Sequence, residues 1–156
     1  MARSDTAPSS EIVIEREFDA PPALVFREWL NEESIRDWFA PETYVTTACR
    51  VDAKPGGSYH IEYRSNDGHV FNEHGVFREV EAPKRLVLTL THVHDGQSGP
   101  ETSITVTFED SARGTRMCFR QTGFDSVEYR DANAEGWQGC FAKLQRRLHR
   151  TATATA

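Results

Sequence analysis

The sequence is poor in cysteine and has neither a long apolar run nor a CxxC pair. Its three cysteines, Cys49, Cys118 and Cys140, are widely spaced. This pattern excludes a disulfide framework, so we expect reduced, small core residues. No apolar run approaches the ~20 residues of a membrane-spanning helix, and residues 1–10 lack the apolar segment of a signal peptide. We therefore expect a cytoplasmic protein with no membrane partner.

The chain also lacks an excess of positive charge. It has 18 Lys and Arg against 24 Asp and Glu, a formal net charge of −6. Nucleic-acid binding needs a basic face. The one basic run, "LQRRLHR" at 144–150, suits the C-terminal end of a helix, where cations stabilise the helix dipole. We expect no nucleic-acid partner.

What is present is enough chain for one domain with its own core, since the sequence has 156 residues. Residues 1–10 are small and polar, and "TATATA" at 151–156 is of low complexity. We expect disordered tails at 1–10 and 151–156 around a single domain at 11–150. Both a monomer and a homodimer are compatible with the sequence.

The apolar pattern changes period along the chain. Residues 11–18 are typical of a strand, and two short helices are predicted at 19–30 and 31–39, the second ending before Pro41. From there to residue 121 apolar and polar residues alternate in six runs, as in "TSITVTF". Turn-forming stretches separate the runs, among them "HDGQSGP" at 94–100. Short connections favour an antiparallel sheet.

The last helix is predicted to begin at Asp125, which forms a capping-box pattern with Glu128. Its core face is apolar in the C-terminal half and mixed in the N-terminal half. Gly136 and Gly139 each cost about 1 kcal/mol in a helix interior. We interpret these features as a helix that covers a sheet at one end and borders an opening at the other. The pattern predicts an α+β fold, a curved antiparallel sheet of about seven strands wrapped around a long C-terminal helix.

Several short motifs occur in order between residues 11 and 149. They are an aromatic pair before a proline, an Asp-x-x-Pro-Gly-Gly turn and a Gly-Trp pair: Trp38, Phe39 and Pro41; Asp52, Pro55, Gly56 and Gly57; Gly136 and Trp137. The stretches that contain them resemble the activator of heat-shock-protein-90 ATPase homologue family, within the START-like (SRPBCC) helix-grip superfamily. The resemblance implies a helix-grip fold with a cavity between the concave sheet and the long helix.

Such cavities are mostly apolar and carry a few polar groups. We expect the cavity to be lined by the following residues: Trp38, Phe39, Tyr59, Ile61, Tyr63, Leu88, Met117, Phe119, Arg130, Asn133, Trp137, Cys140 and Phe141. The alternative is that these side chains form a packed core. Tyr59 and Tyr63 share a strand face, and each buried hydroxyl needs a polar partner, which a ligand or a cavity water would supply.

Three functions are compatible with this architecture. The first is binding of a small apolar or aromatic molecule; the second is a cyclase- or hydratase-type enzyme that uses inward polar groups such as Glu73, Arg130 or Asn133; the third is a chaperone-interacting module. Spacing identifies no nucleophile and base, so no catalytic residue is predicted. His92 and His94 share a strand face, and His69 and His74 come from a neighbouring run, but no Cys or carboxylate motif with metal spacing accompanies them. We therefore predict neither a metal nor another cofactor.

Overall fold

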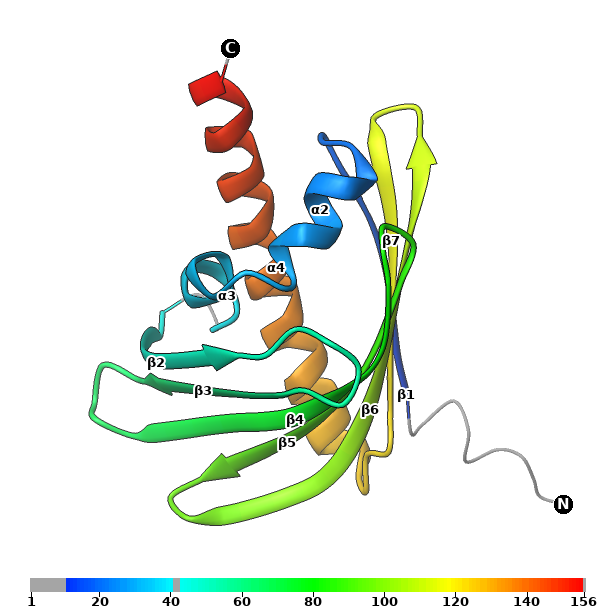
Figure 1. Ribbon diagram of the computed structural model, residues 1–156. Helices are drawn as coiled ribbons and strands as arrows, with labels where there is room; N and C mark the ends of the chain where they lie inside the picture. The colour runs from blue at the N-terminus through cyan, green and yellow to red at the C-terminus, as the bar shows by residue number, and fades with distance from the viewer. Residues whose placement is uncertain (1–10, 41–42, 156) are drawn as a thin grey trace, which may run out of the picture.

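The computed structural model describes residues 11–40 and 43–155 (Figure 1). The tail expected at 1–10 and Pro41 lie outside the described residues. The elements follow in chain order: β1 (Glu11–Phe18), α2 (Pro22–Glu28), α3 (Glu32–Trp38), β2 (Val45–Val51), β3 (Ser58–Arg64), β4 (Val70–Glu81), β5 (Arg85–His94), β6 (Gln97–Ser111), β7 (Gly114–Thr122) and α4 (Val127–Thr155).

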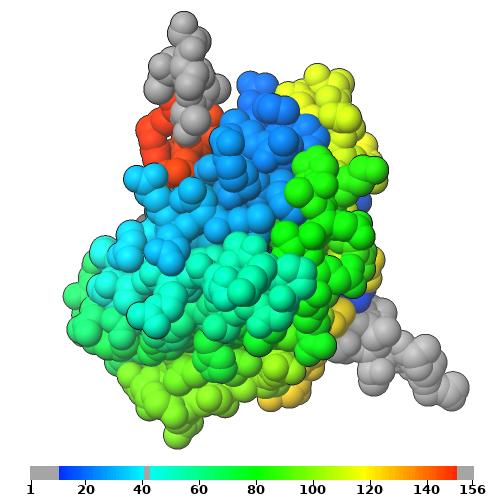
Figure 2. All heavy atoms as spheres, in the orientation of Figure 1, coloured from blue at the N-terminus to red at the C-terminus, as the bar shows by residue number. Residues whose placement is uncertain are grey.

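The seven strands form one antiparallel sheet in the order β1-β7-β6-β5-β4-β3-β2. The sheet curves around α4, while α2 and α3 close the side where the chain crosses from β1 to β2 (Figure 1). In the space-filling view the two short helices, coloured blue to cyan, form a continuous surface with the β2–β3 region (Figure 2). The fold class expected from the sequence is confirmed. None of the described helices combines the length and apolar character that crossing a bilayer requires.

Two glycines permit close backbone approaches in the curved part of the sheet. A Cβ on Gly75 would lie 1.9 Å from the carbonyl oxygen of Thr89 on β5 and 2.8 Å from the ring of Tyr59. A Cβ on Gly57 would lie 2.0 Å from the carbonyl oxygen of Asp52. Because only glycine avoids these clashes, β4 can bend against its neighbours and the Asp-x-x-Pro-Gly-Gly turn can close tightly.

The β5–β6 connection is shorter than the loop expected over 94–100. His94 pairs directly with Gln97, and only Asp95 and Gly96 form the turn, with φ values of 53° and 80°. An Asp-Gly pair with two positive φ values matches the right-handed twist of a hairpin. Pro100 consequently lies within β6, beside an irregularity in the β5–β6 pairing where a missing N–H is tolerated.

The start of α4 differs by one residue from the sequence prediction. Ser126, not Asp125, is the cap, because its side-chain oxygen accepts a hydrogen bond from the backbone N–H of Tyr129 at 3.1 Å. Its carbonyl accepts the first helical bond, from Arg130 at 3.1 Å. At the other end the helical backbone runs to Thr155, past the domain boundary expected at 150, since extending an existing helix needs no new nucleation.

The core between the sheet and α4 is centred on Trp29. Its ring lies at centroid distances of 4.9 to 6.2 Å from five other aromatic rings: Trp38, Phe39, Phe119, Trp137 and Phe141. Aromatic pairs at these separations add packing energy to the burial of their area. The cluster fills the space beneath the middle of α4, and an opening remains toward the N-terminal turns of that helix.

Candidate functional site

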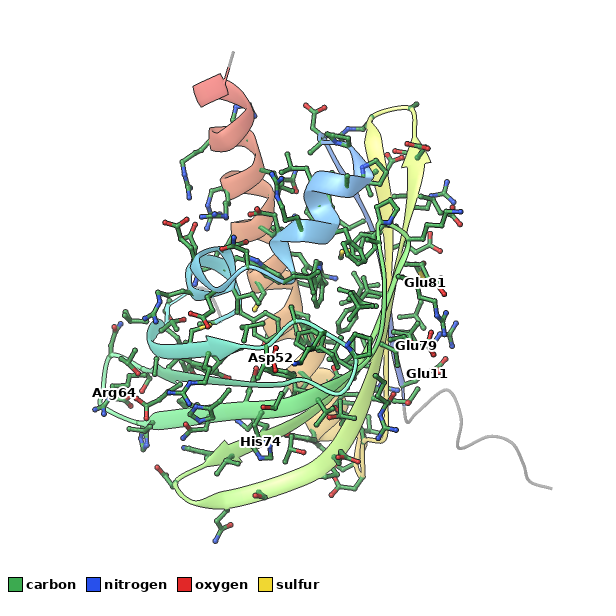
Figure 3. All side chains as sticks on the ribbon, viewed as in Figure 1. Glu11, Asp52, Arg64, His74, Glu79 and Glu81 are labelled. Atoms are coloured by element: carbon green, nitrogen blue, oxygen red, sulfur yellow. The ribbon has the colours of Figure 1, made fainter. Side chains whose placement is uncertain are left out.

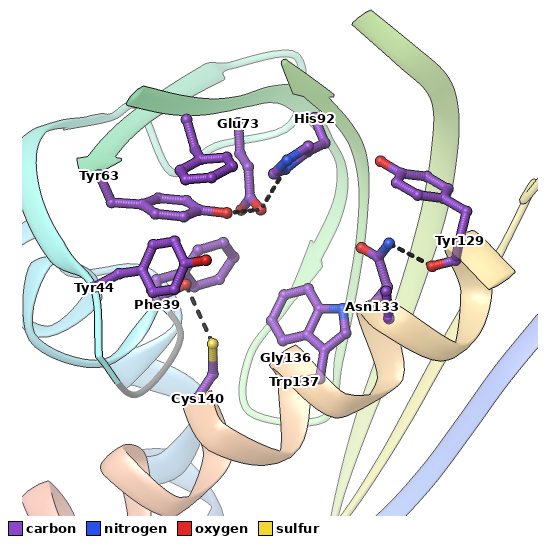
Figure 4. Close-up of a pocket in the computed structure, with 12 residues that line it drawn as sticks. Phe39, Tyr44, Tyr63, Glu73, His92, Tyr129, Asn133, Gly136, Trp137 and Cys140 are labelled. Carbon is purple, nitrogen blue, oxygen red and sulfur yellow. Dashed lines mark hydrogen bonds and ion pairs between the residues drawn. The ribbon is translucent and has the colours of Figure 1, made fainter. Parts of the chain in front are cut away.

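A cavity of about 230 Å³ lies at that position. It is enclosed by β3, β4 and β5 on one side and by the first turns of α4 on the other, with the segment after α3 closing a third side (Figure 4). Its lining is aromatic with several polar groups: Phe39, Tyr44, Tyr63, Phe71, Glu73, His92, Tyr129, Ala132, Asn133, Gly136, Trp137 and Cys140.

The predicted site residues divide between this lining and the core. Those that line the cavity are Phe39, Tyr63, Asn133, Trp137 and Cys140. Those that are buried in the core outside it are Trp38, Tyr59, Ile61, Leu88, Met117, Phe119 and Phe141. Arg130 is also outside the lining, and its guanidinium contacts the carboxylate of Asp131 at 2.7 Å.

Depth along the sheet separates the two groups. Ile61 and Tyr63 lie on the same face of β3, yet Ile61 is fully buried and only Tyr63 reaches the cavity. Farther along α4, Phe141 packs against Phe119 at a centroid distance of 5.4 Å. Period-two and helical patterns identify the inward face of an element, but not how far along it the packed core ends.

The lining residues missing from the predicted set come from β4 and β5, from the first turns of α4 and from the segment before β2. Phe71 pairs with Tyr63 across β3 and β4, and Glu73 pairs with His92 across β4 and β5. Because alternate residues share a sheet face, Phe71 and Glu73 lie beside Tyr63 on the concave side. A strand register would therefore have identified them, whereas hydropathy alone does not select a glutamate or a histidine.

A buried carboxylate forms the polar end of the cavity. The Oε2 atom of Glu73 accepts a hydrogen bond from the Tyr63 hydroxyl at 2.9 Å and contacts Nδ1 of His92 at 3.2 Å (Figure 4). Burial, together with the negative charge of Glu73, raises the pKa of Tyr63, so this phenol remains a hydrogen-bond donor.

Both tyrosines singled out in the sequence find their polar partners within the protein. The Tyr59 hydroxyl donates to the carbonyl oxygen of Thr89 at 2.5 Å, and Tyr63 donates to Glu73. The expectation that a ligand or a cavity water supplies these partners is therefore wrong. The strand pairing explains the result, since β4 and β5 place acceptors next to both hydroxyls.

Trp137 forms a wall of the cavity and is fixed by a buried chain of hydrogen bonds. Its indole Nε1–H donates to Oε1 of Gln121 at 2.8 Å, and Nε2 of Gln121 donates to Oγ1 of Thr102 at 2.9 Å. Thr102 in turn donates to the carbonyl oxygen of Leu90 at 2.7 Å. Gln121 is fully buried, so the chain crosses from α4 to β5 without solvent and sets the orientation of the indole.

The mouth of the cavity lies along the first turns of α4. Asn133 donates from Nδ2 to the carbonyl oxygen of Tyr129 at 2.8 Å, which directs this side chain along the helix (Figure 4). Gly136 is itself part of the lining. Nothing in the structure explains Gly139.

The cysteines differ in their surroundings. Cys140 is buried, and its Sγ lies 3.3 Å from the carbonyl oxygen of Phe39, which ties α4 to the segment after α3. Cys49 and Cys118 carry free thiols and are half-buried. Cys49 packs against the core, whereas Cys118 does not belong to it, so the expectation that all three are core residues is wrong for Cys118. Burial raises the pKa of the Cys49 thiol, which disfavours the reactive thiolate.

Comparisons with known proteins agree with this architecture. The chain resembles the solved structures of an uncharacterized protein from Rhizobium leguminosarum (26% identity, 90% of this chain and 95% of that one, TM-score 0.82) and of the AHSA1 protein from Silicibacter pomeroyi (21% identity, 91% and 99%, TM-score 0.81). A protein from Chromobacterium violaceum is similar at 24% identity over 88% and 96%, with a TM-score of 0.78. No curated protein sequence matches significantly.

The sequence model of one family, described as activator of Hsp90 ATPase homolog 1-like protein, matches residues 19–149. The matched range extends from the segment before α2 to residue 149 in α4, and so includes every residue of the cavity lining. The chain therefore belongs to the activator of Hsp90 ATPase homolog 1-like family.

Proposed function

We propose that the protein binds a small molecule with a single aromatic or apolar ring and a hydrogen-bond donor. The observation that carries this proposal is an aromatic-walled cavity with the carboxylate of Glu73 at one end. Its volume of about 230 Å³ exceeds the ~150 Å³ that accommodates benzene in an apolar protein cavity. A monocyclic ligand with one short substituent fits that space, and a polycyclic ligand does not.

The preference for a ligand with a hydrogen-bond donor follows from the contacts that Glu73 already makes at the polar end of the cavity. Tyr63 donates to Oε2 of Glu73, and Nδ1 of His92 contacts the same oxygen, so both polar groups already have partners within the protein. The carboxylate retains lone pairs that only accept hydrogen bonds. A ligand amine, amide N–H or hydroxyl complements this end, whereas a ligand carboxylate meets charge repulsion in a partly desolvated site.

Three probes of similar size test the proposal: benzylamine, toluene and benzoate. In calorimetric titrations we expect benzylamine to bind more tightly than toluene, and benzoate to bind most weakly. Glu73→Gln should remove the discrimination between benzylamine and benzoate. Glu79→Gln is the matched control, because Glu79 lies on β4 but is exposed and paired with Arg85 (Figure 3). Equal affinities for benzylamine and benzoate in the unmodified protein would contradict the proposal.

A second candidate function, acid–base catalysis of the cyclase or hydratase type, is favoured by the Glu73–His92 contact of 3.2 Å. A carboxylate next to an imidazole at a cavity wall can take and return a proton. The test is mass spectrometry of a metabolite extract incubated with the protein. We expect a small ring compound to be consumed by the unmodified protein and not by Glu73→Gln, and consumption by both would exclude this role. A chaperone partner rests on family resemblance alone and is not part of the proposal.

A further inference from the structure

Two hairpin turns place three metal-ligating side chains together at one end of the sheet, outside the cavity. His69 precedes β4, while His94 and Asp95 end β5 and begin its turn. Phe71 pairs with His94 in antiparallel strands, so His69, two positions before Phe71, lies beside the β5–β6 turn. The ligand atoms of His69, His94 and Asp95 all lie within 4.8 Å of one another.

We propose that His69, His94 and Asp95 bind a divalent transition-metal ion of the zinc or copper type. Oδ2 of Asp95 lies 3.2 Å from Nε2 of His94 and 3.7 Å from Nδ1 of His69. Zinc–ligand bonds of about 2.0–2.2 Å at tetrahedral angles put neighbouring ligand atoms ~3.3–3.6 Å apart. The two distances from Asp95 lie on either side of that range, and the two imidazole nitrogens lie within 4.8 Å of each other.

The ligand atoms determine which class of metal ion the site suits. Two imidazole nitrogens and one carboxylate suit zinc, copper and nickel, whereas magnesium and calcium prefer oxygen ligands alone. All three side chains are about half exposed, which leaves room for water as a further ligand. An exposed site of this kind exchanges its ion readily and differs from the closed sites that hold structural zinc.

Neighbouring groups hold the ligands in place. The His94 ring stacks on Phe71 at a centroid distance of 4.4 Å, and Asp95 is fixed by the tight turn. On the far side of the His69 ring, Nε2 lies 3.7 Å from Oδ2 of Asp67, whose carboxylate accepts a hydrogen bond from Ser65. A carboxylate behind a metal-ligating histidine is a common supporting arrangement, since it orients the ring and leaves the other nitrogen for the ion.

The proposed metal site lies outside the lining of the ligand cavity, although His94 stacks on Phe71, which belongs to that lining. The sequence suggests His92 and His94 as a pair, with His69 in a neighbouring run. In the structure His92 contacts Glu73 at the cavity instead. The turn residue Asp95 joins His69 and His94 as the third ligand.

The test is calorimetric titration of the untagged, metal-stripped protein with ZnCl₂ and, separately, CuCl₂. We expect saturable binding of about one ion per chain. His69→Ala and Asp95→Asn should each weaken binding at least about tenfold, the lower range for disturbed metal sites. Asparagine suits the second variant because it tolerates the positive φ of this turn.

His74→Ala is the matched control, since His74 is an exposed histidine on β4 outside the cluster (Figure 3). It should bind both ions as the unmodified protein does. Circular dichroism and thermal unfolding without metal establish that each variant is folded. The proposal is overturned if no saturable binding occurs, or if folded His69→Ala and Asp95→Asn bind like the unmodified chain, because the ion would then be held elsewhere.

Discussion

The hydrogen-bond chain behind Trp137 offers the sharpest test of how the cavity wall is held. Gln121→Met keeps a side chain of similar length but removes the acceptor that Trp137 uses at 2.8 Å. Trp137 is buried, so its indole N–H would be left without a partner. An orphaned buried donor costs about 1–3 kcal/mol of unfolding free energy. Thr102 still donates to Leu90 and adds little to the loss.

For a chain of this size, 1 kcal/mol corresponds to a shift of about 2–4 °C in Tm, so we expect Gln121→Met to lower Tm by about 2–12 °C. Differential scanning calorimetry and urea unfolding measure the change. A double-mutant cycle isolates the indole contribution, because Trp137→Phe removes the donor. In that background Gln121→Met should cost at least about 0.5 kcal/mol less. If Gln121→Met lowers the free energy of unfolding equally with Trp137 and with Trp137→Phe, the hydrogen bond between Gln121 and Trp137 does not hold the indole in place.

Three further predictions concern stability. Burial, with a contribution from the charge of Glu73, raises the pKa values of Tyr59 and Tyr63. The folded chain therefore keeps phenol protons that the unfolded chain releases above pH ~10, and stability should be complete below that pH and fall above it by up to about 1.4 kcal/mol per pH unit per tyrosine. Urea unfolding at several alkaline pH values measures this slope, and Tyr63→Phe should reduce it. Arg147→Met should cost about 1–3 kcal/mol in the same assay, since its Nε donates to the buried carboxylate of Glu28 at 2.5 Å; an unchanged midpoint would show that the pair contributes nothing. Gly57→Ala should cost at least about 1–3 kcal/mol, because the new Cβ would meet a backbone oxygen at 2.0 Å, and wild-type thermal stability would disprove that close approach.

The fold was predictable because its signals are local. Segments with alternating apolar and polar residues, such as 102–108, identify strands with one solvent-exposed and one buried face. This segment lies in β6 and shows the expected alternation of burial. The face of α4 that carries Trp137, Cys140 and Phe141 is buried as its spacing indicates. Period and turn residues depend on neighbours within a few positions, so one sequence is enough to identify them.

The site was predictable only in part, because it depends on tertiary placement. Whether an inward residue meets the core or the cavity depends on where the cluster around Trp29 ends, and no local pattern encodes that position. Glu73 and His92 meet only through the β4–β5 register. Likewise His69 and Asp95 come together only because two hairpin turns lie at the same end of the sheet.

The most direct test of the ligand-binding account is the electron density of crystals soaked in benzylamine. The account predicts a ring between Trp137 and Phe71, with its amine within hydrogen-bond distance of the Glu73 carboxylate. Side chains that fill this space, or a cavity that contains only solvent at saturating benzylamine, would contradict it.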